Sequence, residues 1–336
     1  MTTTEKNKAN ILTDRFGRIH DYLRISLTDN CNFRCSYCMP DLDHEFTPHE
    51  KLMTAGEIRA IAEEFVRLGV NKIRLTGGEP LIRKDFPEIL SLLAPLNAEL
   101  LISTNGFLLD RHLPDLLKAG IRTVNISLDS LRPEVFFKVT GQDKFERVWK
   151  NIHLMLDHGL RVKINVVAIK GIIEEEVLDF IDLTRDLPLH VRFIEFMPFT
   201  GNHWAGDQVV TASQLLEIAM ERYDVVKLLD EPHATARKYM AIGHKGSFAF
   251  ITTMSNQFCH ECNRLRITAE GKLKNCLFGK DEIPLLELLR SGRDLHASIQ
   301  ESLQLKHKEL GGQFDRDFKK VNPDAIANRS MISIGG

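Results

Sequence analysis

Apolar and polar residues follow one another along the first two thirds of the chain in alternating short and long periods. Leu23, Ile25 and Leu27 alternate with polar residues, which predicts a strand with one buried face. Thr54 then precedes apolar residues at helical spacing, and Glu57 completes a capping-box pattern, so a helix is expected to begin there. The same succession of strand and helix returns five more times. The chain therefore predicts six strand–helix units.

The other units have bounds that can be read from the same periods. The further predicted strands cover residues 70–75, 100–102, 123–128, 162–169 and 191–196. The further predicted helices cover residues 86–93, a segment that closes at Gly120, and residues 145–157, 176–184 and 213–222. Repeated strand–helix units predict a parallel sheet with helices outside it. The periods alone fit an open doubly wound sheet and a partial barrel equally well.

The pattern changes after about residue 227. Residues 238–252 predict short antiparallel strands, and a helical stretch follows near residues 285–308. We therefore divide the chain into a loosely held N-terminal arm (1–20), an α/β core (21–226) and a smaller C-terminal α+β region (227–336) that packs against the core.

The six cysteines form two tight groups and leave no stray thiol. Cys31, Cys35 and Cys38 have the spacing C-x3-C-x2-C in a loop after the first strand, and the second group has the spacing C-x2-C-x13-C at Cys259, Cys262 and Cys276. Three thiolates can hold a cubane iron–sulfur cluster with one iron open to another ligand. The alternative is zinc, which requires a fourth ligand; in the second group only His260 is near enough in sequence to complete that set.

Composition excludes several classes of partner. With 336 residues, 43% of them hydrophobic, and a net charge of −2, the chain has no overall field that would attract nucleic acid or an anionic membrane. The first residues lack the apolar segment of a secretory signal, and no apolar run approaches the ~18 residues needed to cross a bilayer. We expect a cytoplasmic protein with reduced thiols and with neither a nucleic-acid nor a membrane partner.

Basic residues lie on several predicted strands, where a parallel barrel would gather them in its lumen. They are Arg24, Lys72, Arg74, Lys163, Arg192, Arg264 and Arg266. Guanidinium groups match phosphate oxygens bidentately, so this set suggests a polyanion such as a nucleoside triphosphate. The alternative is that some of these side chains pair with nearby acids or face water.

The turn Gly77-Gly78-Glu79-Pro80 follows the second predicted strand. It is too short for a phosphate-binding P-loop, which disfavours a P-loop nucleotide hydrolase. Because glycine lacks a Cβ atom, this turn would allow a ligand to approach the backbone closely. The alternative is an ordinary turn between a strand and a helix.

The first cysteine group, with Tyr37 directly before its last cysteine, resembles the signature of the radical S-adenosylmethionine (SAM) enzymes. The resemblance implies a partial (β/α)6 TIM-type barrel, and a 4Fe–4S cluster whose open iron is chelated by SAM. It further implies that the glycine turn holds the amino group of SAM, and that one electron from the cluster splits SAM to release a 5′-deoxyadenosyl radical.

A narrower resemblance, to the GTP 3′,8-cyclase family of molybdenum cofactor biosynthesis, covers nearly the whole chain. The matching stretches are residues 24–29, 73–80, 125–129, 192–197 and 258–266 and the terminal Gly335-Gly336. This resemblance implies a lyase that converts GTP to (8S)-3′,8-cyclo-7,8-dihydroguanosine 5′-triphosphate, the first step of that pathway. It implies two 4Fe–4S clusters and SAM as cofactors, an external electron donor, and transfer of the product to the next enzyme.

The narrower resemblance also implies the role of each matching residue. Cys31, Cys35 and Cys38 would hold the first cluster, and the contacts to SAM would be Tyr37, Gly78, Ser127 and Met197. Cys259, Cys262 and Cys276 would hold a second cluster whose open iron faces guanine. The contacts to GTP would be Arg24, Arg74, Ser103, Lys163, Arg192, Arg264, Leu265 and Arg266, and the catalytic tail would be Gly335 and Gly336. Ser103 departs from the usual threonine of the family but keeps the hydroxyl group.

Two other functions stay open from the sequence. One is a radical SAM enzyme that modifies peptides and has an auxiliary cluster, although that class usually has more C-terminal cysteines. The other is a non-enzymatic iron–sulfur electron carrier or sensor, which would need neither the glycine turn nor the gathered basic residues. The sequence also leaves open whether the chain forms a homodimer and whether the C-terminal tail is ordered.

Overall fold

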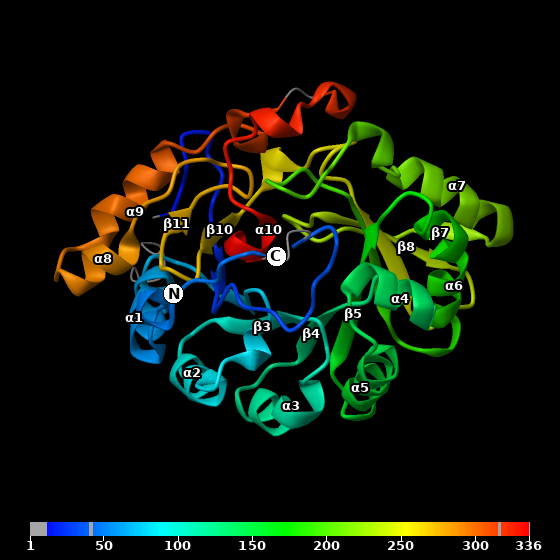
Figure 1. Cartoon of the computed structure of the whole chain (residues 1–336), viewed down its shortest axis with the longest axis horizontal. Helices are drawn as coiled ribbons and strands as arrows, with labels where there is room; N and C mark the ends of the chain where they lie inside the picture. Colours follow the sequence, from blue (N-terminus) through cyan, green and yellow to red (C-terminus); the bar gives the residue numbers. More distant parts are fainter. Residues whose placement is uncertain (1–11, 40–42, 315–316, 336) are drawn as a thin grey trace, which may run out of the picture.

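The computed structural model describes residues 12–39, 43–314 and 317–335. Within these ranges the strands form one sheet in the order β11-β10-β1-β2-β3-β4-β5-β6-β9-β8-β7. The sheet curves with its helices outside, and its two edges do not pair with each other (Figure 1). It is an open, partial barrel, as the family resemblance implies.

Six strand–helix units form the middle of the sheet and confirm the succession read from the sequence. The strands are β1 (Tyr22–Ser26), β2 (Lys72–Thr76), β3 (Glu99–Thr104), β4 (Thr123–Ser127), β5 (Arg161–Ala168) and β6 (His190–Glu195), paired in parallel. The helices are α1 (Ala55–Arg67), α2 (Phe86–Leu93), α3 (Leu109–Lys118), α4 (Pro133–Thr140), α5 (Phe145–Asp157), α6 (Ile173–Asp186) and α7 (Ala212–Arg222).

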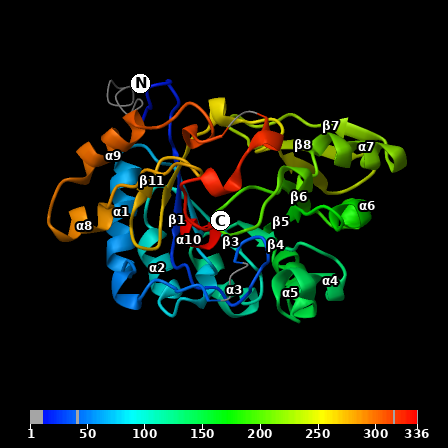
Figure 2. The same ribbon diagram turned by 45° about the horizontal axis from the view of Figure 1, so that its top comes forward.

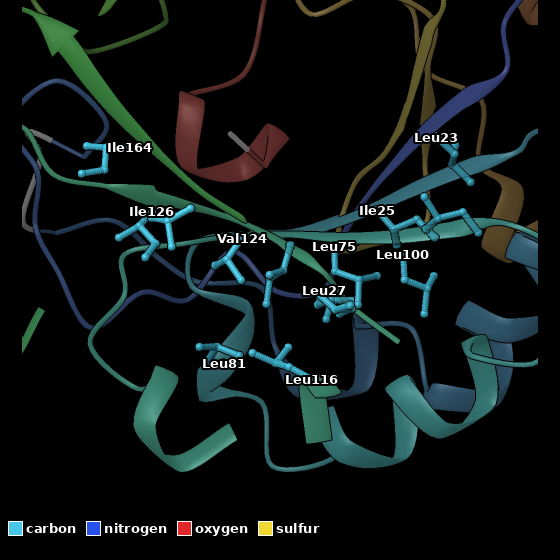
Figure 3. Packing of buried hydrophobic residues seen from close by; sticks show 14 of the residues in the cluster. Leu23, Ile25, Leu27, Leu75, Leu81, Leu100, Leu116, Val124, Ile126 and Ile164 are labelled. Atoms are coloured by element: carbon cyan, nitrogen blue, oxygen red, sulfur yellow. The ribbon is translucent and has the colours of Figure 1, made fainter. Parts of the chain in front are cut away.

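The core lies between the sheet and its outer helices. Leu23 and Ile25 of β1 are fully buried and belong to one hydrophobic cluster that also includes Leu116 of α3 (Figure 3). Successive side chains of a strand point to opposite faces, so Arg24 between them is directed into the lumen. The predicted capping box at the start of α1 is present: Thr54 and Glu57 each accept a hydrogen bond from the other's backbone N–H.

The C-terminal region extends the same sheet at both edges. Its elements are β7 (Val225–Lys227), β8 (Ala236–Ala241), β9 (Ser247–Ile251), β10 (Arg264–Ile267), β11 (Leu273–Lys274), α8 (Leu285–Arg290), α9 (Leu295–Gln304) and α10 (Met331–Ile334). The predicted antiparallel pair of strands is confirmed as β8 and β9. In addition, β9 pairs in parallel with β6, and β10 pairs in parallel with β1. The division into regions at residues 20 and 226 stays a prediction.

One helix is not predicted from the sequence, and one local expectation is wrong. Helix α4 was not expected, because an eight-residue helix that begins at Pro133 and ends at the left-handed Gly141 resembles a loop in sequence. The N-terminal arm is not loosely held over its described residues 12–20. Arg18 is only 8% exposed and donates hydrogen bonds to the carbonyl oxygens of Cys259, His307 and Lys308.

The short helix α10 lies inside the curve of the sheet, in the middle of both views (Figures 1 and 2). Helix α10 and Gly335 therefore lie over the concave side of the barrel, with Gly335 next to Ser26 of β1. Among the described residues, no helix combines the length and the apolar character that crossing a bilayer would need.

Candidate active site

A cavity of about 710 Å³ occupies the concave side of the sheet. All six cysteines line it, each with a free thiol, as do all seven of the basic strand residues. The residues expected to contact SAM and Ser103 also line it, as does Gly335. Leu265 is the exception, because its side chain is fully buried in the hydrophobic core. Gly336 lies outside the described residues.

The first cysteine group lies in the loop after β1, in apolar and acidic surroundings. Burial raises the pKa of Cys31 to about 11, and the nearby Glu79 adds to the effect. Burial, followed by the charge of Asp129, raises the pKa of Cys35 well above its ordinary value. Thiols in such a site are retained as thiolates only if a metal centre takes the place of their protons. These three residues therefore suit an iron–sulfur cluster.

Tyr37 is fixed beside this group by its phenol. The hydroxyl donates a hydrogen bond of 2.8 Å to Asp129, which also accepts one from the backbone N–H of Val167. Burial raises the pKa of Asp129 to about 6. Because Asp129 follows the end of β4, this contact joins the cysteine loop to that strand.

The glycine turn packs closely against the cysteine loop. A Cβ atom on Gly77 would lie 2.4 Å from the carbonyl oxygen of Thr28, and one on Gly78 would lie 2.2 Å from that of Asn30. The close approach is therefore to the chain's own cysteine loop, although Gly78 also lines the cavity. Glu79 is fully buried and accepts hydrogen bonds from Leu81, Thr104 and Asn105, which ties the turn to the end of β3.

The second cysteine group has cationic surroundings. Cys259 begins a short 3₁₀ turn (Cys259–Glu261). Cys262 lies just before the start of β10, and Cys276 lies just after the end of β11. Burial alone would raise the pKa of Cys262, but Lys306 and then Arg264 outweigh it and lower that pKa to about 7.

The zinc alternative at the second group loses its proposed fourth ligand. The His260 side chain is 68% exposed and lies 4.0 Å from Glu261. In the described part of the chain, no three His, Cys, Asp or Glu side chains are arranged around a single metal ion. The thiolate ligands of a 4Fe–4S cluster bind different irons, so that arrangement is not required of them.

Strand register places three arginines in one row on the lumen side. Arg24 of β1 lies opposite Arg266 of β10 on one side and opposite Arg74 of β2 on the other. Like charges directly across neighbouring strands are destabilising. Burial and then the charge of Arg266 lower the pKa of Arg24 well below its ordinary value. A row of this kind suits the binding of an anion.

The opposite wall continues the cationic surface. Burial, reinforced by other cavity cations, lowers the pKa of Lys163 to about 8 and that of Arg192 to about 9. In the described ranges, Nε and Nη2 of Arg192 and Nη2 of Arg264 are buried without a hydrogen-bond partner. Buried donors of this kind are rare in folded proteins, and a polyanionic ligand would satisfy them. The residues present therefore fit a nucleoside triphosphate.

The C-terminal tail reaches the row of arginines. The guanidinium Nη1 of Arg266 donates a hydrogen bond of 3.1 Å to the carbonyl oxygen of Gly335. A Cβ atom on Gly335 would lie 2.8 Å from that of Ser26, and its φ of +83° is rare for other residues. Gly335, which the resemblance assigns to the tail, therefore lies at the cavity.

Sequence reasoning missed several residues that shape the site. Glu195 at the end of β6 accepts hydrogen bonds from the backbone N–H groups of Met254 and Ser255. Arg18 donates a hydrogen bond to the carbonyl oxygen of Cys259, and Lys306 lies within hydrogen-bond distance of the sulfur of Cys262. An acidic residue at a strand end is a signal that could have found Glu195, whereas the two cations lie in polar stretches that resemble surface.

Comparisons with known proteins agree with this geometry. The model of the radical SAM superfamily matches residues 25–184, and that of the Molybdenum Cofactor Synthesis C family matches residues 189–311. Among solved structures, SuiB of Streptococcus suis bound to S-adenosylmethionine has a TM-score of 0.60 at 18% identity, over 84% of this chain and 68% of that one. SuiB bound to its precursor peptide SuiA has a TM-score of 0.63 at 16% identity, over 88% of this chain and 66% of that one. At these identities the likeness shows the fold alone.

Curated relatives match almost the whole chain. The mitochondrial GTP 3′,8-cyclase of Arabidopsis thaliana is 44% identical over 334 residues, which are 98% of this chain and 84% of the relative. GTP 3′,8-cyclase of Desulforamulus reducens is 39% identical, over 89% of this chain and 93% of the relative. Molybdenum cofactor biosynthesis protein 1 of Mus musculus is 45% identical over 96% of this chain, which spans about half (51%) of that longer relative.

The partial barrel and the first cysteine group define a radical SAM enzyme. The region that carries the second cysteine group matches the Molybdenum Cofactor Synthesis C family. The chain belongs to the GTP 3′,8-cyclase family of molybdenum cofactor biosynthesis.

Proposed function

We propose that this protein converts GTP to (8S)-3′,8-cyclo-7,8-dihydroguanosine 5′-triphosphate, the first step of molybdenum cofactor biosynthesis. The observation that carries the proposal is that two cysteine groups and seven cations line one cavity of about 710 Å³. An electron carrier would need no such cationic space between its clusters. Membership of the cyclase family supports the same reaction.

The first cysteine group would hold a 4Fe–4S cluster that binds SAM. When bound, the cluster and SAM would supply a 5′-deoxyadenosyl radical that takes a hydrogen atom from C3′ of GTP. C3′ would then bond to C8 of guanine at the expense of the C8=N7 double bond, and one electron from the external donor and one proton at N7 would complete the 7,8-dihydro product. Tyr37, Gly78, Ser127 and Met197 line the cavity around this group, and we assign them to SAM. Their part is to orient SAM, because a short and fixed separation of reacting atoms accelerates reaction.

The cationic wall would hold the triphosphate and so fix the ribose. Arg24, Arg74 and Arg266 form its row, and Lys163, Arg192 and Arg264 face it. Ser103 accepts a hydrogen bond of 3.4 Å from Arg74, so its role would be to orient that guanidinium as well as to contact GTP. Leu265 would contribute through its backbone, because its side chain faces the core.

The second cysteine group would hold a second 4Fe–4S cluster whose open iron binds guanine. With the triphosphate on the cationic wall, this contact would hold both ends of the nucleotide. The tail would close the cavity beside Arg266 through Gly335. We assign Gly336, the next residue in the chain, to the same catalytic tail. We further propose a cytoplasmic enzyme, in keeping with six free thiols, that takes electrons from an external donor and passes its product to the next enzyme. A homodimer is part of this proposal.

An anaerobic incubation tests the proposed reaction. The reconstituted protein is mixed with dithionite, SAM and each nucleoside triphosphate in turn, and 5′-deoxyadenosine and nucleotide products are measured by mass spectrometry. We expect deoxyadenosine to rise with GTP only, together with a cyclised product of the same mass as GTP. Deoxyadenosine formed equally without any nucleotide would refute GTP as substrate, and a peptide substrate would then be tested. If protein with intact clusters forms no deoxyadenosine, the proposed enzymatic activity would be refuted and an electron carrier would be favoured.

A further inference from the structure

A buried lysine next to the second cysteine group has no role in the proposed reaction. Lys306 follows α9, and only 2% of its surface is exposed. A lysine is almost never fully buried unless its charge is paired. Its environment therefore shows which negative charge it meets.

The ammonium group of Lys306 joins the two segments that carry the cysteines. Its Nζ donates hydrogen bonds to the carbonyl oxygen of Asn275, at 2.5 Å, and to that of Arg264, at 3.2 Å. Asn275 directly precedes Cys276, and Arg264 is two residues after Cys262. One side chain thus fixes the distance between two of the three thiols.

The third partner of the ammonium group is a sulfur atom. Nζ lies 3.8 Å from Sγ of Cys262, within hydrogen-bond distance for sulfur. Among the described residues, no carboxylate pairs with Lys306, so its charge is left to the thiolates. Burying a cation without an anion is strongly unfavourable, and a negatively charged cluster would supply that anion.

Other buried groups near Lys306 do not supply the missing charge. Arg18 is itself cationic and is already paired with Asp14 at 2.6 Å. Burial, and then the charge of Lys306, lowers the pKa of His20 to about 3, so that imidazole is neutral. The surroundings of the second group therefore contain an excess positive charge.

We propose that Lys306 is a positioning residue for the second cluster, which joins its cysteine segments and raises its reduction potential. Reduction adds one electron, and with it one negative charge, to the cluster. A cation and a hydrogen bond at a ligating sulfur stabilise the reduced form relative to the oxidised one. This inference rests on the proposed function, because it requires a cluster on Cys259, Cys262 and Cys276.

The test is a redox titration of the full-length, reconstituted protein followed by electron paramagnetic resonance. The signal of the first cluster is identified by its change when SAM is added, so that cluster is an internal control. In Lys306→Met we expect the equilibrium constant for reduction of the second cluster to fall at least tenfold. For a one-electron couple this is a shift of about 59 mV to more negative potential. The first cluster should keep its potential.

Two further variants separate charge from shape. Lys306→Gln removes the charge but keeps a hydrogen-bond donor, and it replaces the methionine variant if that variant does not fold. Lys306→Arg keeps the charge and should stay close to the wild-type potential. An unchanged potential in both neutral variants, each with a full second cluster, would overturn the proposal. Loss of the second cluster in the arginine variant as well as in the neutral ones would also overturn it, since shape alone would then explain the residue.

Iron content distinguishes this failure from failure of the proposed function. Wild-type protein should bind about eight irons per chain, four for each cubane. A wild-type content of about four irons would refute the second cluster itself, before any variant of Lys306 is made.

Discussion

The two cysteine groups face one cavity but have opposite electrostatic surroundings. The first group has the buried acids Glu79 and Asp129 beside it, and the pKa of Cys31 is raised to about 11 by burial and Glu79. The second group has Lys306 at a sulfur, and the pKa of Cys262 is lowered to about 7. An anion near a cluster disfavours its reduced form and a cation favours it. We therefore expect the first cluster to have the lower potential, as a strong reductant of SAM requires.

Removing one cysteine from each group should separate the two halves of the reaction completely. Cys38→Ser should abolish cleavage of SAM, because the first cluster is lost. Cys276→Ser should still cleave SAM but form no cyclised nucleotide, because guanine has lost its site. Deoxyadenosine and nucleotide products are quantified in parallel, and each variant is the control for the other. Normal cyclisation by Cys276→Ser would mean that the second group does not bind substrate.

A glycine substitution should break the first group alone. A Cβ atom on Gly78 would meet the carbonyl oxygen of Asn30 at 2.2 Å, so Gly78→Ala must displace the cysteine loop. We expect loss of about half of the bound iron, all from the first group. Gly56→Ala is the matched control, because nothing lies within 4 Å of that position and alanine favours its helix. Iron analysis and the spectrum of the remaining cluster measure the outcome; full iron content in Gly78→Ala would contradict the account.

Neutralising one cation of the cationic wall should weaken the binding of GTP without changing the binding of SAM. A charge-assisted hydrogen bond contributes about 1.5–3 kcal/mol, so Arg192→Gln should raise the Kd for GTP by about 10- to 100-fold. Arg59→Gln, on the exposed face of α1, should leave it unchanged. Calorimetric titration with each ligand gives both affinities. An equal loss of SAM affinity in Arg192→Gln would show general damage instead of a specific contact.

The smallest expected effect concerns the tail that reaches both groups. Arg329, just before α10, pairs with Glu282 at 2.6 Å and with Glu270 at 3.1 Å. Burial alone would raise the pKa of both carboxyl groups. The hydrogen bonds and charge of Arg329 outweigh the effect of burial, so both pKa values lie below 4.5. The stabilisation from these pairs is therefore complete above pH 4.5 and is lost as pH falls through the lowered values.

Hydrogen exchange of the cluster-free protein measures this change. After correction for the intrinsic rate, protection of residues 329–335 should decrease on acidification below pH 4.5. Arg329→Met should show the same decrease already at pH 7. Protection that is equal in the variant and the wild type at pH 7 would mean that these ion pairs do not hold the tail.

Local signals in the sequence predicted most of the fold. Thr54 and Glu57 predicted the start of α1, because a capping box needs only residues three positions apart. The pairing of β10 with β1 could not be predicted, because Tyr22 and Arg264 are separated by 241 residues and neither strand specifies its neighbour. Contacts at such separations depend on the whole fold.

The candidate site also contains residues that the sequence could predict and residues that it could not. The spacing of the cysteines identified both groups, because ligands of one cluster must lie close together in the chain or in the fold. Lys306 could not be identified, because its partners are backbone carbonyl groups and one sulfur from distant segments. The sequence around it resembles an exposed polar stretch.

The most direct test of the central claim is to record the resonance spectrum of both reduced clusters while SAM and GTP are added separately. The account predicts that SAM changes only the signal of the first cluster and that GTP changes only the signal of the second. A GTP-induced change confined to the first cluster, or no change at all with GTP bound, would contradict the claim that the first cluster binds SAM and the second binds GTP.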